Sequence, residues 1–101
     1  MRLTEHEAAA IRRAVIANFG ADAEVKLFGS RADDSKRGGD IDLFIETDIE
    51  DRQEIFKREL SLLGALYAAI GEQKIDLVVK PRGDGIDLPI HQVARELGVS
   101  L

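Results

Sequence analysis

The sequence contains no cysteine, no excess of positive charge and no long hydrophobic run. Without cysteine the chain cannot form disulfides, thiolate metal sites or a cysteine nucleophile. The 14 Lys and Arg residues against 19 Asp and Glu residues give a net charge of −5, which disfavours general binding to nucleic acid. These absences indicate an acidic protein whose chemistry does not use thiols and which suits a reducing cytosol.

The sequence also gives no sign of export or membrane insertion. Its first seven residues carry Arg2, Glu5 and Glu7, where a secretory signal has an apolar stretch. The longest apolar run, 62–70, is interrupted by Gly64 and is shorter than the roughly 20 residues that span a bilayer. With 101 residues, 45% of them hydrophobic, we expect one domain over 1–101 with a real core, located in the cytoplasm.

Helical periodicity occurs in three segments, and each has a start signal. Thr4 and Glu7 have the spacing of a capping box, Asp48 is the expected N-cap of a long helix, and Pro89 opens a short one. Gly20, Gly71 and Gly98 are the expected stops. The predicted helices therefore cover 4–20, 48–71 and 89–98.

Strand periodicity occurs between these helices, at 24–28, 40–46 and 74–80. In the second strand Ile41, Leu43 and Ile45 share one face, and Asp40, Asp42 and Phe44 share the other. The order of elements predicts a small α+β fold, an α/β sandwich in which helices pack on a mixed sheet of three or more strands. The pattern does not determine the strand directions.

Three aspartates lie in strands that should pack against helices, where charge is unfavourable. Asp40 and Asp42 project from one face, about 7 Å apart along the strand, so both carboxylates can bind one hard cation such as Mg²⁺. Asp76 projects from the face of the third strand opposite its apolar face. Its carboxylate lies near those of Asp40 and Asp42 if the second and third strands are neighbours in suitable register. Such a site suits two cations and an attacking hydroxyl. The alternative is that Asp40 and Asp42 line a solvated strand or pair with Lys36 and Arg37.

The first strand ends at a Gly29-Ser30 turn. Glycine lets the backbone approach an anion, the Ser hydroxyl and turn amides can donate to phosphate oxygens, and Arg31 adds a positive group. A plain turn explains this dipeptide equally well on its own. Its position is what suggests a function, because a phosphate cradle would lie next to a cation-binding pair.

The run Leu27-Phe28-Gly29-Ser30-Arg31, with Gly39-Asp40-Ile41-Asp42-Leu43 beginning eight positions after Arg31, resembles the signature of the DNA polymerase β nucleotidyltransferase superfamily, in its minimal nucleotidyltransferase branch. The similarity covers nearly the whole chain, because 74–79 resembles the strand that carries the family's third carboxylate. The resemblance implies that Gly29, Ser30 and Arg31 bind a nucleoside triphosphate. It also implies that Asp40, Asp42 and Asp76 hold two Mg²⁺ ions and that Asp76 assists deprotonation of the acceptor. The implied reaction transfers AMP from ATP and releases pyrophosphate.

One departure from the family pattern concerns the phosphate loop. Members often continue Arg-Ala-Arg-Gly, whereas here Arg31-Ala32 is followed by Asp33-Asp34, which leaves open whether a second basic group contacts phosphate. Lys36 or Arg37 is the expected replacement. We also expect a partner to contribute contacts to the base and the acceptor.

Minimal nucleotidyltransferases of this kind resemble the antitoxin half of systems whose toxin is a HEPN-type ribonuclease. The resemblance implies AMP transfer to a toxin hydroxyl (AMPylation), commonly that of a tyrosine, or neutralisation by binding alone. The acidic balance suits a basic partner. A small-molecule nucleotidyltransferase, for example one that modifies an aminoglycoside, is a third hypothesis. Arg82 and Asp84 follow the third strand, and either border the site or form a polar turn.

Overall fold

The computed structural model describes residues 3–32 and 39–101, and within them the fold contains three α-helices and four strands. The helices are α1 (Glu5–Phe19), α2 (Arg52–Ile70) and α3 (Pro89–Leu97). The strands are β1 (Glu24–Phe28), β2 (Ile41–Thr47), β3 (Ile75–Pro81) and β4 (Val99–Ser100). Two short 3₁₀ turns, η1 (Gly29–Ala32) and η2 (Arg82–Asp84), follow β1 and β3. The predicted α+β fold with a mixed sheet is confirmed.

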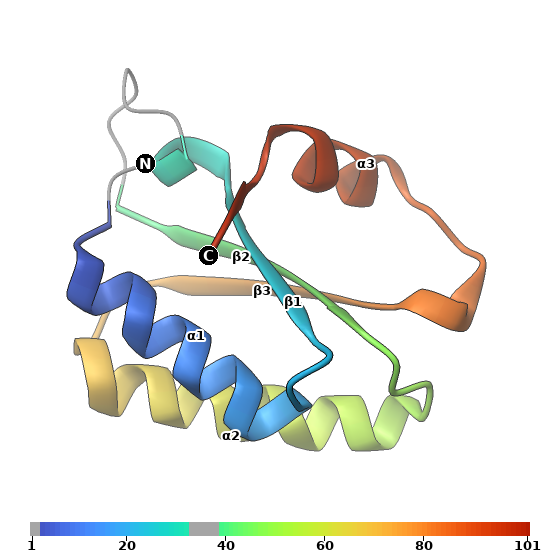
Figure 1. Ribbon diagram of the computed structural model, residues 1–101, viewed down its shortest axis with the longest axis horizontal. Coiled ribbons are helices and arrows are strands. Elements are labelled where there is room, and N and C mark those ends of the chain that lie inside the picture. The colour runs from blue at the N-terminus through green and yellow to red at the C-terminus, as the bar shows by residue number, and fades with distance from the viewer. Residues whose placement is uncertain (1–2, 33–38) are drawn as a thin grey trace.

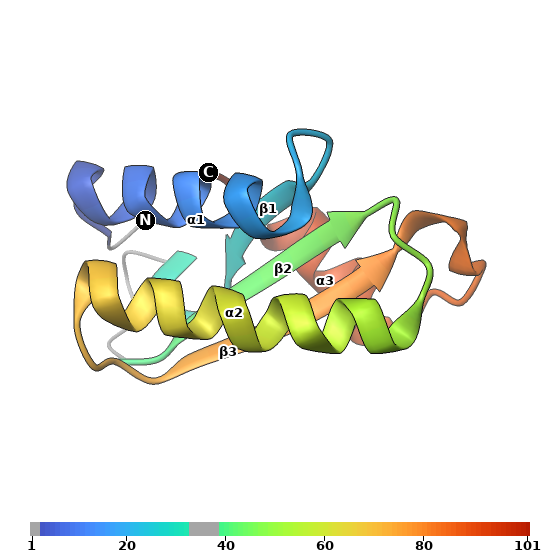
Figure 2. The ribbon, with the colours of Figure 1, turned by 90° about the horizontal axis from the view of Figure 1, so that it is seen from below.

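The strands form one sheet in the order β3-β2-β1-β4. β1 is antiparallel to both β2 and β4, while β2 and β3 are parallel and are joined through α2. A parallel pair requires such a crossover connection, because a tight turn only reverses the chain. Helices α1 and α2 lie on one face of the sheet, and α3 lies on the other (Figure 1; Figure 2).

The core lies between the sheet and the α1–α2 layer. Its fully buried side chains alternate along the strands and recur at helical spacing, as expected for two packed layers. They include Ile11, Val15, Leu27, Ile41, Leu43, Ile45, Leu62 and Leu66. Along β2 the apolar residues on this face alternate with Asp42, which therefore points to the face that α3 occupies.

The start of α1 agrees with the sequence. The Thr4 side chain accepts a hydrogen bond from the Glu7 amide, and the Glu7 carboxylate accepts one from the Thr4 amide, both at 3.0 Å. These reciprocal bonds satisfy amides that have no partner within the helix. Gly20 follows α1 and Gly71 follows α2, as predicted.

The predicted start of α2 was wrong. Asp51 and not Asp48 is its N-cap, since the Asp51 carboxylate accepts from the amides of Gln53 and Glu54. Asp48 instead accepts from the Arg82 guanidinium at 3.0 Å. Strand β4 was not predicted, because its two residues are too few to show a periodicity. Among the described residues, no helix is both long and apolar enough to cross a membrane.

Candidate active site

Asp42 and Asp76 lie side by side on neighbouring strands. They are register partners in the parallel pair β2–β3, and each follows a buried residue, Ile41 or Ile75, that points to the core. Because side chains alternate along a strand, both carboxylates project from the opposite face. The structure thus brings together two of the three predicted carboxylates. Asp42 is half-buried and Asp76 is exposed.

This arrangement changes the proton affinity of Asp42. Burial raises the pKa of the Asp42 carboxyl, and the negative charge of Asp76 and a hydrogen bond with it raise that pKa further. The charge of Asp40 acts in the same direction, and Lys74 opposes it. Two carboxylates this close are therefore unfavourable as a bare pair, and they need a proton or a cation between them.

Asp40 lies at the same end of the sheet, just before β2, but its side chain has a different partner. Its carboxylate lies 3.5 Å from the Lys74 ammonium; the Lys74 side chain is largely exposed and that of Asp40 is half-buried. Within residues 3–32 and 39–101, no group of three or more His, Asp or Glu side chains is arranged to hold one metal ion. The described pair is therefore Asp42 with Asp76, and the two-ion site with Asp40 stays a prediction.

The Gly29 turn closes against this pair. Gly29 follows β1, whose last residue, Phe28, is the register partner of Asp42. Its φ of 74° lies in the left-handed region, and a Cβ added to it would overlap the Asp42 carboxylate. Glycine is required here both by the backbone and by the approach of Asp42. The predicted phosphate turn is therefore adjacent to the carboxylate pair.

Arg31 is held from two sides within the η1 turn. Its guanidinium donates to the Gly39 carbonyl and to the Gln73 side-chain oxygen, each at 3.2 Å. The Gln73 amide group in turn donates to Glu7 at 3.2 Å and to the Ile70 carbonyl at 2.9 Å. These bonds link the η1 turn to the segments that precede β2 and β3. The triphosphate contact predicted for Arg31 stays a prediction.

Gln73 was missed by the sequence analysis. The bond from Arg31 spans 42 residues, and a single Gln in a polar turn gives no pattern that would indicate it. Several predicted residues cannot be placed. The Ser30 side chain, and all of Asp33, Asp34, Lys36 and Arg37, lie outside the described part of the chain.

Arg82 does not border the carboxylates. It follows the last residue of β3, whereas Asp76 lies near the first, so the two lie at opposite ends of the strand. Its guanidinium donates to Asp48, to Glu24 and to the Asp22 carbonyl. Arg82 therefore fastens the end of the sheet remote from the candidate site.

The donor set fits a hard divalent cation. Asp42 and Asp76 offer only carboxylate oxygens, and their mutual repulsion is what a bound cation relieves. Because Gly29 has no side chain, the Asp42 carboxylate lies directly against the turn. Mg²⁺ commonly binds one or two carboxylates together with the phosphates of a substrate. These residues are thus suited to hold a metal-bound polyphosphate, with the carboxylates on the metal and the turn next to the phosphates.

The mixed sheet thus places a pair of aspartates beside a glycine turn. The nucleotidyltransferase domain family matches residues 9–91, a range that contains Gly29, Asp42 and Asp76. The chain belongs to this family, and nucleotidyl transfer is its general function. Members of the family generally use a nucleoside triphosphate and a divalent metal ion. Comparison with curated proteins gave no match.

Proposed function

We propose that the chain is a Mg²⁺-dependent nucleotidyltransferase that moves AMP from ATP to a hydroxyl group of a partner protein. The partner would be a HEPN-type ribonuclease, with the chain acting as its antitoxin. The general activity follows from family membership. The finer parts rest on the resemblance of the 27–31 and 39–43 motifs to the minimal branch of the superfamily. The observation that carries the catalytic part is the pairing of Asp42 with Asp76 beside Gly29.

In the proposed reaction the acceptor oxygen attacks the α-phosphorus of ATP. The bond from that phosphorus to the bridging oxygen breaks, pyrophosphate leaves, and the hydroxyl proton passes to a base. Asp76 is the proposed base, because it is exposed and lies next to Asp42. Divalent cations held by the carboxylates would neutralise phosphate charge and lower the pKa of the attacking hydroxyl. Gly29 and the following turn would position the triphosphate, as phosphoryl-type transfer requires.

The test uses ATP labelled at the α- or the γ-phosphate, MgCl₂ and a purified HEPN-type ribonuclease. Wild-type chain should place α-label, and no γ-label, on the ribonuclease. Asp42→Asn should reduce this label at least 100-fold, because it removes a charged ligand from the site. Asp48→Asn is the matched control, since Asp48 is an exposed aspartate beyond the other end of β2. Equal labelling by wild type and Asp42→Asn would refute a catalytic role for the pair.

A second candidate function is a non-catalytic antitoxin that neutralises the ribonuclease by binding. The contact between Asp40 and Lys74 favours this candidate, because Asp40 is one of the three predicted metal ligands and its carboxylate is here paired with an ammonium group. Measurement of ribonuclease activity in the labelling assay separates the two functions. Neutralisation that survives Asp42→Asn, without any label, supports binding alone. Neutralisation that requires both ATP and Asp42 supports transfer.

A further inference from the structure

Helix α3 packs with its polar side on the sheet and its apolar side outward. The residues that it buries are His91 and Ala94, whereas Val93 is 49% exposed and Leu97 71% exposed. A helix that covers the core of its own domain normally turns its apolar stripe inward. The apolar side of α3 is therefore not used by the fold described here.

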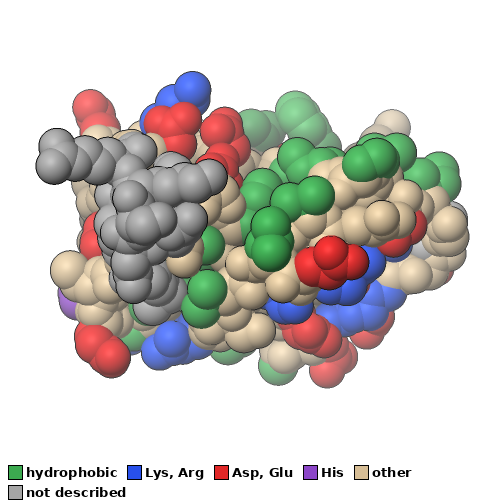
Figure 3. Space-filling view, turned by 90° about the horizontal axis from the view of Figure 1, so that it is seen from above, with side chains coloured by type: hydrophobic (Ala, Val, Ile, Leu, Met, Phe, Trp, Pro, Cys, Tyr) green, Lys and Arg blue, Asp and Glu red, His purple; other side chains and the backbone are tan. Residues whose placement is uncertain are grey.

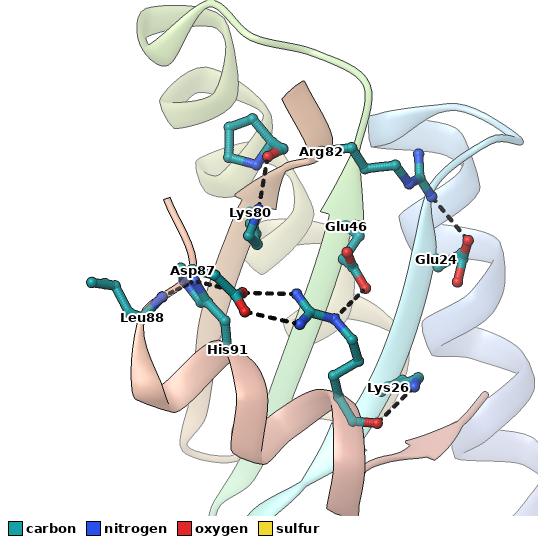
Figure 4. A network of polar contacts seen from close by, with 10 residues as sticks. Glu24, Lys26, Glu46, Lys80, Arg82, Asp87, Leu88 and His91 are labelled. Atoms are coloured by element: carbon teal, nitrogen blue, oxygen red, sulfur yellow. Dashed lines mark hydrogen bonds and ion pairs between the residues drawn. The ribbon is translucent and has the colours of Figure 1, made fainter. Parts of the chain in front are cut away.

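Polar contacts hold α3 in this orientation (Figure 4). The Arg95 guanidinium donates to both carboxylate oxygens of Asp87, at 3.0 and 3.3 Å, and lies 3.6 Å from Glu46 of β2. It also lies over the Phe44 ring, 5.8 Å from the ring centroid. Lys26 of β1 donates to the Arg95 carbonyl at 2.9 Å. The contacts of Arg95 with Glu46 and Phe44, and of Lys26 with the Arg95 carbonyl, tie this side of α3 to the sheet. The helix therefore cannot turn its apolar side inward without breaking them.

Among the described residues, five of the nine large apolar side chains that are exposed lie in the segment before α3 and along the helix. We call them the α3 patch, and each is 45–71% exposed: Ile86, Leu88, Ile90, Val93 and Leu97. Figure 3 shows apolar side chains gathered on this side of the molecule. A contiguous apolar patch on a folded surface marks an interaction site more often than scattered apolar residues do.

The α3 patch belongs to the same side of the molecule as the carboxylates. Phe44, which contacts His91 and Arg95 of α3, lies two residues after Asp42 on the same face of β2. Two residues along a strand correspond to about 7 Å. A protein seated on α3 would therefore reach the face from which Asp42 and Asp76 project.

Charge favours a basic occupant over a second copy of the chain. Beneath α3, Arg95 is paired with the carboxylates of Asp87 and Glu46, while Lys26 and the buried Lys80 each donate to a backbone carbonyl. Glu96 is exposed on α3, and Asp42 and Asp76 project from the same face of the sheet on which α3 lies. A second copy would bring another net charge of −5, whereas Lys and Arg around an apolar surface would be attracted.

We propose that the α3 patch is the docking surface for the partner protein, which presents an apolar surface bordered by lysine and arginine. The inference rests on the proposed function, since the docked protein is the acceptor of the nucleotide. Docking on α3 holds the acceptor hydroxyl at the carboxylates, and converts a collision between two proteins into a reaction within one complex. The patch therefore determines affinity for the acceptor and not the chemistry of transfer.

The test compares three variants that each place a charge on an exposed apolar position. Val93→Asp and Leu97→Asp alter the α3 patch, and Leu60→Asp is the matched control on α2, where Leu60 is 56% exposed on the other side of the sheet. Calorimetric titration with the purified HEPN-type ribonuclease should show at least tenfold weaker binding for both patch variants. KM for the ribonuclease should rise at least tenfold, while kcat and the Kd for Mg-ATP stay unchanged. Leu60→Asp should match wild type in all these measurements.

The other outcomes separate this proposal from the proposed function. Equal ribonuclease binding by all variants, with label still incorporated, overturns docking on α3 and retains transfer. Patch-dependent binding without label supports docking and overturns transfer. A patch-dependent dimer of the chain in sedimentation experiments, with no ribonuclease bound, overturns the docking proposal because a second copy is then the occupant. If wild type neither binds nor labels the ribonuclease, both proposals are overturned.

Discussion

Arg31 donates a hydrogen bond to Gln73 at 3.2 Å, and this bond connects the turn after β1 to the segment before β3. Gln73 also bonds to Glu7 near the start of α1. The neutral Gln73 side chain thus joins the η1 turn to the start of α1. The arrangement makes Gln73 a positioning residue, because it fixes Arg31 and has no described contact with Asp42 or Asp76.

Removal of either partner should weaken the site through this bond. In a double-mutant cycle with Arg31→Ala and Gln73→Ala, we expect a coupling free energy of unfolding of about 0.5–3 kcal/mol. Urea unfolding of the four proteins measures it. Gln73→Ala should also raise the Kd of a fluorescent ATP analogue in Mg²⁺, because the η1 turn loses a support. If the changes in unfolding free energy of the two single variants add up to that of the double variant, the bond does not contribute to stability in solution.

Gly29→Ala should lose nucleotide binding as well as stability. The new methyl group meets the Asp42 carboxylate and also forces a left-handed φ on alanine, which costs roughly 1–2 kcal/mol. Gly71→Ala isolates the second effect, since Gly71 has a φ of 83° with open space around its Cβ position. Both variants should lose stability in urea, and only Gly29→Ala should lose binding of the ATP analogue. Equal binding by the two variants would mean that Gly29 serves the turn alone.

Asp42→Asn should stabilise the protein when divalent metal is absent. Its carboxyl has a raised pKa because of burial and the neighbouring Asp76 charge, so neutralising it relieves an unfavourable interaction. In EDTA the Tm of the variant should exceed that of wild type. Added Mg²⁺ should raise the wild-type Tm, because a ligand that binds the folded state stabilises it, and should leave the variant nearly unchanged. A Tm of Asp42→Asn below that of wild type in EDTA would contradict the repulsion between the two carboxylates.

Glu7 should make stability depend on pH at the acidic end. The Thr4 amide hydrogen bond, assisted by Gln73, Thr4 and Arg31 side chains, holds the pKa of Glu7 below its ordinary value of 4.5. A lowered pKa in the folded state stabilises the protein above the unfolded-state pKa, and that contribution is lost as pH falls through the folded-state value. Glu7→Gln is a suitable comparison, because Gln can retain the capping box without the charge.

The stability advantage of wild type over Glu7→Gln should therefore be complete above pH 4.5 and should shrink below it. Its size is expected to be about 0.3–1 kcal/mol, typical of a carboxylate at a helix N-terminus. Thermal unfolding of both proteins between pH 3 and 7 gives the difference. A difference that stays constant over this range would contradict the lowered pKa.

Much of the fold was predictable because its determinants are local. The Thr4–Glu7 capping box, the alternation around Asp42 and the glycine after β1 each depend on residues close in sequence. Asp48 was assigned the wrong role because its partner, Arg82, lies 34 residues away. Asp48 and Asp51 are both residues that can cap a helix. The distant bond from Arg82 to Asp48 leaves Asp51 as the N-cap of α2.

The candidate site was predictable in part for the same reason. Alternation predicted the face of Asp42 and of Asp76, but the parallel register that makes them neighbours depends on how α2 packs. The spacing of Ile90, Val93 and Leu97 predicted helix α3 without indicating that these residues point outward. Their orientation depends on the bonds of Arg95 to Asp87 and Glu46, which no local pattern contains.

The pairing of Asp42 with Asp76 also constrains how the chain can misfold. If β3 shifted by one residue against β2, every β3 side chain would change faces, and Asp76 would enter the layer beneath α1 and α2. An ionised carboxylate has no compensating partner among those aliphatic side chains, so the shifted sheet is strongly disfavoured. The acidic residues proposed for chemistry thereby also disfavour misaligned strands.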